Sequence, residues 1–134
     1  MSAPALKRLD LSAFFALAEA REGKWELFDG VPIAMSPERL RRGTAEFEAG
    51  IALRDAIRRE GLGCQASVDT LTIKINDYLA FVPDALVVCP PPPPDAIVID
   101  NPLILVEVLS PSTAAVDQGS SWRVTFLCPP WRII

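Results

Sequence analysis

The sequence from Val82 to Thr113 reads VPDALVVCPPPPPDAIVIDNPLILVEVLSPST, and it decides the fold expected for this 134-residue chain. Its two apolar, β-branched runs, each bounded by proline, predict neighbouring buried strands. Each run carries one acid, Asp84 in the first and Glu107 in the second. An ionised carboxylate inside a dry strand costs several kcal/mol unless a metal ion, another cation or hydrogen bonds compensate it.

For either acid alone, hydrogen bonding at a strand end is as good an explanation as a functional role, since buried charges often have only a structural role. The two together favour a functional role, because pairs of oxygen donors are what Mg²⁺ and Mn²⁺ sites are built from. Asp84 and Glu107 are therefore the candidate metal ligands.

Length and composition are those of one folded domain, expected over residues 1–134. Half of the residues are hydrophobic, and 22% are charged. No apolar run approaches the roughly 20 residues of a membrane helix, and the start of the chain has no secretory signal pattern. We therefore expect a cytoplasmic protein without a membrane partner.

The chain contains no histidine, which excludes Ser-His and Cys-His nucleophile pairs and imidazole zinc sites. Any catalysis must use carboxylates, lysine or a metal ion held by oxygen. The three cysteines, Cys64, Cys89 and Cys128, are odd in number and widely spaced. They match neither a zinc pattern nor a disulfide framework, and we interpret them as buried thiols.

The net charge of −4 does not indicate a nucleic-acid-binding protein. Eleven of the thirteen basic residues nevertheless lie at or before Lys74. A basic helix face could contact phosphates, although a solvated face is the commoner explanation. The candidate contacts are Arg39, Arg41, Arg42, Arg54 and Arg58.

Three elements are expected before residue 64. Leu11, Phe14, Phe15 and Ala18 have the spacing of an amphipathic helix, capped by Asp10 or Ser12. Residues 25–35 alternate around an Asp-Gly turn and predict a hairpin, with Glu26 on the polar face of its first strand. A helix then runs from Ser36-Pro37 to about Glu60, with Leu40, Phe47, Ile51 and Ile57 facing inward and the arginines opposite.

The alternation in residues 64–75 predicts one half-buried strand, and Pro90–Pro94 predict a rigid connecting loop. Residues 120–134 show no clean period, and we treat them as an atypical C-terminal tail.

Several segments resemble the Uma-type endonuclease family of the PD-(D/E)XK nuclease superfamily. They are WELFDG (25–30), AMSP (34–37), PDALVV (83–88) and VEVLSPST (106–113). The resemblance covers about residues 11–119. It implies a restriction-endonuclease-like α/β (α+β) fold, a mixed β-sheet flanked by helices. It also implies Asp84 and Glu107 as metal ligands for Mg²⁺ or Mn²⁺, and Glu26 as a third catalytic acid.

Two departures from the family pattern follow Glu107. Superfamily members usually carry a lysine beside or after the second acid, but Leu109, Ser120 and Ser121 occupy those positions and no lysine follows Lys74. Lys74 is a candidate substitute from a neighbouring strand. The closing family elements are also not recognisable after about Gly119, which suggests a truncation or a change of reading frame. An edge exposed in this way favours a homodimer, for which an exchange of segments is one route.

Three functions remain in competition. The first is a Mg²⁺-dependent endonuclease that hydrolyses DNA phosphodiesters. The second is a non-catalytic remnant of the nuclease fold that binds DNA weakly. The third is a protein-interaction module that presents the proline run and the apolar tail.

Overall fold

The computed structural model describes residues 7–108, 124–128 and 132–133 of the chain. In chain order its elements are α1 (Leu11–Ala20), β1 (Trp25–Phe28), β2 (Val31–Ala34), α2 (Leu40–Arg59), β3 (Gln65–Val68), β4 (Thr72–Asn76), β5 (Leu79–Phe81), β6 (Ala85–Val88), β7 (Val98–Ile99), β8 (Ile104–Val108), β9 (Val124–Cys128) and β10 (Arg132–Ile133).

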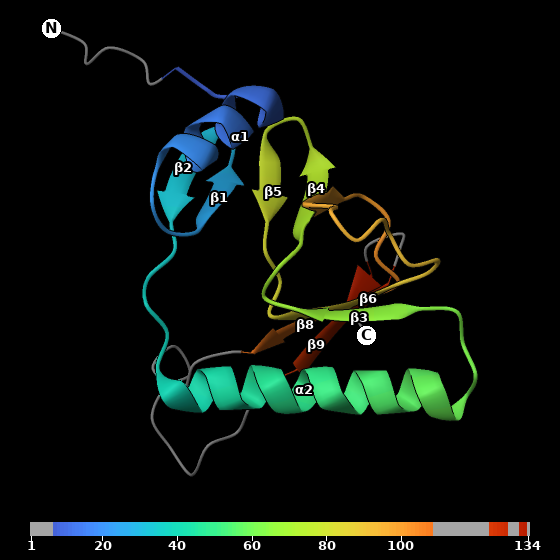
Figure 1. Ribbon diagram of the computed structural model, residues 1–134. Coiled ribbons are helices and arrows are strands. Elements are labelled where there is room, and N and C mark those ends of the chain that lie inside the picture. Colours follow the sequence, from blue (N-terminus) through green and yellow to red (C-terminus); the bar gives the residue numbers. More distant parts are fainter. Residues whose placement is uncertain (1–6, 109–123, 129–131, 134) are drawn as a thin grey trace, which may run out of the picture.

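The strands form two sheets, with the orders β2-β1-β5-β4-β7 and β10-β9-β8-β6-β3. Figure 1 shows α2 lying along the outer face of the second sheet, while α1 covers the hairpin β1–β2 of the first. The only parallel pair among the described strands is β4 with β7. The α+β class and the restriction-endonuclease-like fold expected from the sequence are confirmed, although the strands divide between two sheets instead of forming one.

The division occurs within residues 64–75, for which one strand was expected. That expectation was wrong, because the chain turns at Asp69 (φ 48°) and continues in the other sheet. Strand β3 pairs with β6, and β4 pairs with β5 and β7. The alternating pattern is the same in both halves, so periodicity alone could not locate the turn.

The hairpin and the first helix follow the sequence closely. Strands β1 and β2 pair antiparallel, and the turn residues Asp29 and Gly30 both have positive φ, as a two-residue hairpin turn requires. Asp10 caps α1 by accepting a hydrogen bond from the Ala13 amide at 2.8 Å. Phe14 of α1 packs with Leu27 of β1 in a small core beneath the helix.

Helix α2 differs from the sequence expectation in its start and in its inward face. It begins at Leu40 instead of at Ser36-Pro37, and Arg39 precedes it without a side-chain cap. Leu40 and Phe47 were expected to face inward, but they are 87% and 65% exposed. The buried residues of α2 are Glu46, which meets Asp84, and Gly50, which packs against Val68 of β3.

The main core lies between the two sheets. Leu86 and Val88 of β6 and Leu105 of β8 meet Leu71 and Ile73 from the β4 side there. Because β6 is buried at all four of its positions, the acid that precedes it is carried into the interior.

The cysteine interpretation was wrong for two of the three residues. Cys64 and Cys89 form a disulfide with their Cα atoms 4.4 Å apart. The register pairs Gln65 with Val88, so the two cysteines are the next opposed residues beyond β3 and β6. A sequence separation of 25 residues gives no hint of this pairing until the register is known.

Part of the C-terminal tail closes the second sheet. Strand β9 pairs with β8, and β10 pairs with β9, so β8 is not an edge strand. The open edge expected beside β8 is therefore absent from the described structure. The Ser110–Thr113 motif and the segment Asp117-Gln118-Gly119 lie outside the described residues, as do Leu109, Ser120 and Ser121.

Candidate functional site

Asp84 and Glu107 lie opposite each other at the end of β6 and β8 that is next to the start of α2. Strands β6 and β8 pair Ala85 with Val106, and the same register continued by one residue sets Asp84 across from Glu107. Opposed residues of an antiparallel pair point to the same face of the sheet. The structure therefore brings together the two acids that the sequence singled out.

Asp84 is the centre of the site and is only 2% exposed. Its carboxylate accepts a hydrogen bond from the Val108 amide, and Arg42 Nη2 lies 3.1 Å from one of its oxygens and 3.3 Å from the other. These contacts compensate the buried charge by hydrogen bonding and ion pairing, which is the structural explanation that the sequence had left open. Arg42 comes from the first turn of α2, so helix packing positions the cation.

Glu107 is less well compensated than Asp84. Its pKa is raised to about 8, first by burial and then by the charge and the hydrogen bond of neighbouring Asp84. Glu26 adds to this effect, whereas Arg42 opposes it. Two carboxylates that share one small volume cannot both ionise easily without an added cation.

Glu26 reaches the same region from the first sheet. One of its carboxylate oxygens accepts a hydrogen bond from the Val82 amide at 3.0 Å. Burial raises the pKa of Glu26, the Val82 hydrogen bond opposes this, and the charge of Asp84 raises it again. The third acid expected from the sequence thus lies within the electrostatic reach of the other two.

Sequence reasoning missed the contribution of α2 to this cluster. Glu46 is 3% exposed, and its pKa is raised to about 8 by burial and then by its hydrogen bond with Asp84. Arg42 Nε lies 3.4 Å from Glu46 and 3.5 Å from Glu38. The four-residue spacing of these three residues, which puts them on one face of the helix expected from Ser36-Pro37, is the signal that could have revealed them.

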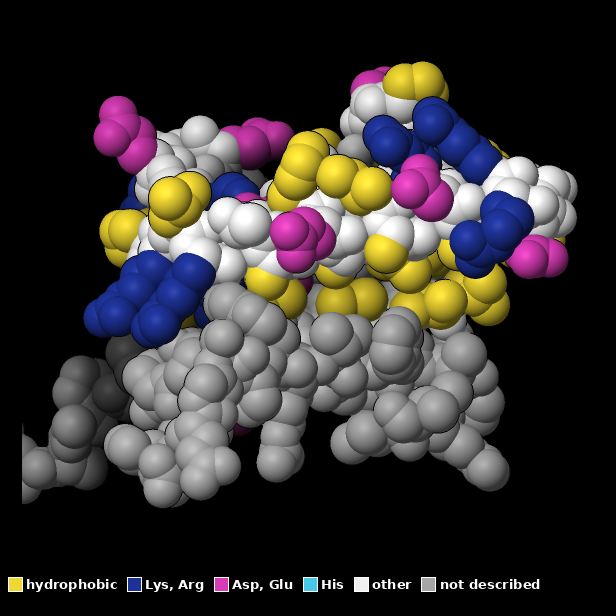
Figure 2. Space-filling model, turned by 90° about the horizontal axis from the view of Figure 1, so that it is seen from below, with side chains coloured by type: hydrophobic (Ala, Val, Ile, Leu, Met, Phe, Trp, Pro, Cys, Tyr) yellow, Lys and Arg dark blue, Asp and Glu magenta, His cyan; other side chains and the backbone are white. Residues whose placement is uncertain are grey.

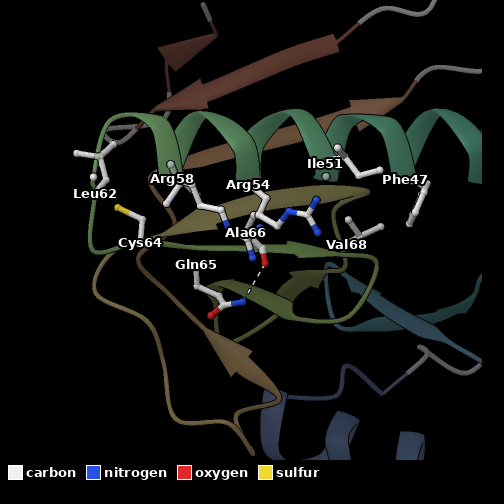
Figure 3. A pocket seen from close by; sticks show the side chains of 12 residues that line it. Phe47, Ile51, Arg54, Arg58, Leu62, Cys64, Gln65, Ala66 and Val68 are labelled. Atoms are coloured by element: carbon white, nitrogen blue, oxygen red, sulfur yellow. Dashed lines mark hydrogen bonds between the residues drawn. The ribbon is translucent and has the colours of Figure 1, made fainter.

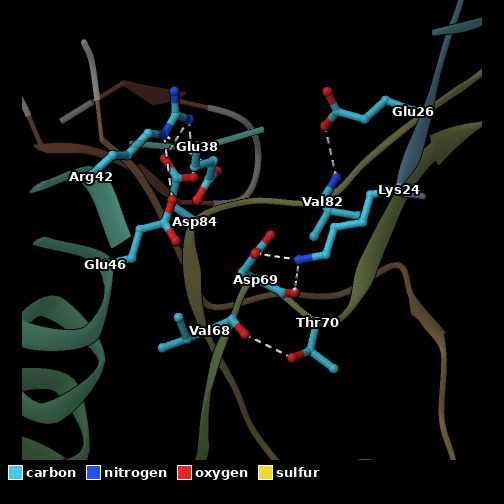
Figure 4. Close-up of polar contacts among 10 residues, drawn as sticks. All are labelled: Lys24, Glu26, Glu38, Arg42, Glu46, Val68, Asp69, Thr70, Val82 and Asp84. Atoms are coloured by element: carbon cyan, nitrogen blue, oxygen red, sulfur yellow. Dashed lines mark hydrogen bonds and ion pairs between the residues drawn. The ribbon is translucent and has the colours of Figure 1, made fainter. Parts of the chain in front are cut away.

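Asp69 and Lys24 complete the polar cluster, which Figure 4 shows. Carboxylate oxygens of Glu38, Glu46 and Asp69 all lie within 4.8 Å of one another. Lys24 Nζ forms an ion pair with the Asp69 carboxylate and donates to the Asp69 carbonyl oxygen at 3.1 Å. A lysine therefore stands at the edge of the acidic cluster, although it precedes both sheet acids in the sequence.

Lys74, the substitute suggested by the sequence, lies elsewhere. Its ion pair in the described structure is with Asp77, at 3.4 Å, beyond the end of β4. The arginines also separate into groups. Arg42 turns inward to the acids, Arg39 and Arg41 are exposed beside the cluster, and Arg54 and Arg58 lie near the other end of α2.

A family model described as "Uma2: Putative restriction endonuclease" matches residues 11–124 of this chain. The chain belongs to the Uma2 family. The match includes both sheet acids, Glu26 and the whole of α2. Searches of curated proteins and of solved structures gave no match.

Membership of the Uma2 family associates the site with nuclease-like chemistry, and restriction-endonuclease-like proteins generally use divalent metal ions. The acidic cluster described above is compatible with such an ion. Neither of the two helices in the described part of the chain combines the length and the apolar character needed to cross a bilayer.

Proposed function

We propose that this Uma2 protein is a divalent-metal-dependent endonuclease that hydrolyses DNA phosphodiester bonds. In this proposal Asp84 and Glu107 hold a Mg²⁺ or Mn²⁺ ion, and Glu26 is the third acid. The observation that carries the proposal is the register of β6 and β8, because it directs the buried Asp84 and the half-buried Glu107 to one face of the sheet. Such a pair is costly in a purely structural role.

The residues present fit a divalent cation by their chemistry. All the donors are carboxylate oxygens, which Mg²⁺ and Mn²⁺ prefer. The raised pKa values of Glu107 and Glu46, each about 8, reflect burial and crowding by Asp84. A nearby cation offsets both effects and stabilises the ionised carboxylates.

A bound divalent ion supplies a water of lowered pKa and neutralises charge that develops on the phosphodiester. The chain's own residues supply the positioning. The Val108 amide fixes the orientation of Asp84, and the Val82 amide fixes that of Glu26. Because burial raises its pKa, Glu26 can accept a proton from an attacking water more readily than an ordinary glutamate.

Basic residues beside the cluster support binding of the substrate backbone. Arg39 and Arg41 are exposed at the start of α2, next to Glu38. Lys24 provides a cation at the cluster, where the chain lacks the expected lysine after Glu107. Cations at these positions would stabilise negative charge on the phosphate during hydrolysis.

A cleavage assay tests the proposal. Supercoiled plasmid and single-stranded DNA are incubated with the purified protein and Mg²⁺ or Mn²⁺, with EDTA in parallel. We expect metal-dependent cleavage that falls by about 100-fold or more in Asp84→Asn and in Glu107→Gln, because each removes a charged ligand. Glu19→Gln is the matched control, since Glu19 is an exposed acid of α1.

Circular dichroism at the assay temperature must show that each variant remains folded. Cleavage that persists in EDTA, or that is equal in wild type and Glu107→Gln, contradicts the proposal.

A second candidate function is supported by the position of Arg42. Its guanidinium contacts both oxygens of Asp84, so it already provides the charge compensation that an ion would give. A non-catalytic DNA-binding descendant of the nuclease fold would have this arrangement. DNA binding by wild type without cleavage in either metal would favour this alternative.

A further inference from the structure

A groove separates the second half of α2 from strand β3, away from the acidic cluster. Its volume is about 470 Å³, and Phe47, Ile51, Arg54, Leu62, Ala66 and Val68 are among its lining residues. Figure 3 shows these side chains around the opening, with Phe47 and Leu62 towards opposite ends. Phe47 and Leu62 are 65% and 53% exposed, which is high for large apolar side chains.

The floor of the groove is an open sheet edge. Strand β3 is the last strand of its sheet, and no described strand pairs with its outer side. Val87, the partner of Ala66, turns its carbonyl oxygen away to the Leu103 amide at 2.7 Å. Because backbone groups of opposed residues point the same way relative to their shared ladder, the Ala66 N–H and C=O point away from β6.

The β3 edges of two copies of the chain are complementary when one copy is turned so that the two strands run antiparallel. Antiparallel pairing of two β3 strands sets the Phe47 end of one groove against the Leu62 end of the other. The same reversal brings Glu48, beside Phe47, towards Arg54 and Arg58 of the second copy. Figure 2, a view onto α2, shows hydrophobic side chains along the exposed helix face between basic and acidic groups.

We propose that a second copy of this chain occupies the groove and forms a two-fold dimer through β3 and α2. The pairing joins two five-stranded sheets into one and gives the outward Ala66 N–H a partner, while the Ala66 carbonyl already accepts from Gln65 Nε2 at 3.2 Å. Phe47 of each copy enters the space above Ala66 of the other, where the small side chain leaves room. This inference concerns a surface separate from the acidic cluster and does not depend on the proposed activity.

Sedimentation equilibrium of the full chain tests the dimer. We expect wild type to be dimeric at micromolar concentration, and Phe47→Glu to raise the dissociation constant by about 100-fold, because it places a charge in an apolar contact. Leu40→Glu is the matched control, since Leu40 is 87% exposed on the same helix but does not line the groove. It should leave the dissociation constant unchanged.

A charge exchange tests the orientation of the two copies. Glu48→Arg should weaken the dimer by bringing like charges together, and adding Arg54→Glu should restore much of the loss. A monomeric wild type, or equal effects of Phe47→Glu and Leu40→Glu, would overturn the proposal. Failure of the exchange to restore association would also overturn it, as would binding of DNA by monomers through Arg54 and Arg58.

Discussion

The stability of the metal-free protein should fall as the pH rises, and Glu107→Gln should weaken this dependence. In the folded state the pKa of Glu107 is raised from 4.5 to about 8, and that of Glu46 is raised by a similar amount. Between these values the folded protein keeps protons that the unfolded chain has released. The free energy of unfolding is therefore highest near the unfolded pKa and decreases as the pH approaches 8.

The size of the effect follows from the number of protons involved. Each proton held only by the folded state changes the free energy of unfolding by at most about 1.4 kcal/mol per pH unit. Glu107 and Glu46 together give wild type a maximal slope of about −2.7 kcal/mol per pH unit. Glutamine at position 107 cannot ionise, so the variant should show about half of this slope.

Urea unfolding in the presence of EDTA, at several values between about pH 5 and pH 8, measures the slope directly. Asp100→Asn is a suitable control because Asp100 is exposed just before β8, and it should leave the slope unchanged. The reasoning is refuted if wild type becomes more stable as the pH rises, or if Glu107→Gln has the wild-type slope.

Three further predictions concern the surroundings of the site. Arg42→Met should destabilise the metal-free protein by about 2–3 kcal/mol in urea unfolding and should increase the calorimetric affinity for Mn²⁺, because the guanidinium no longer occupies Asp84. Gly50→Ala should lower the free energy of unfolding, measured in urea, by about 1–3 kcal/mol, since an added Cβ would lie 2.3 Å from a Val68 methyl carbon. An unchanged free energy of unfolding would contradict the close packing of α2 on β3. Replacing both Cys64 and Cys89 with serine should cost about 3 kcal/mol under oxidising conditions and little in reductant, as thermal unfolding with and without dithiothreitol would show.

The parts of the fold that the sequence predicted depend on short-range signals. The Asp29-Gly30 turn specified the hairpin because both residues must adopt positive φ. Asp84 and Glu107 could be singled out because a charge inside an apolar run is conspicuous, and antiparallel register then placed them together. Their roles as metal ligands stay predictions.

The parts that the sequence did not predict depend on long-range packing. The inward face of α2 carries Glu46 and Gly50 instead of Phe47, because Glu46 meets Asp84 and Gly50 packs closely on Val68 of β3. A hydrophobic pattern identifies the apolar residues of a helix, but which of them meet the sheet depends on how the helix lies across it. The turn at Asp69 and the Cys64 pairing were missed for a similar reason, since each requires the sheet order.

The most direct test of the proposed metal site is calorimetric titration of the chelator-treated protein with Mn²⁺ at about pH 7.5. We expect saturable binding that releases protons, because ionised carboxylates replace protonated ones when the ion binds. Glu107→Gln should abolish this binding, and Glu19→Gln should retain it. Absence of binding to wild type, or equal binding by Glu107→Gln, would contradict the assignment of Asp84 and Glu107 as a shared ion site.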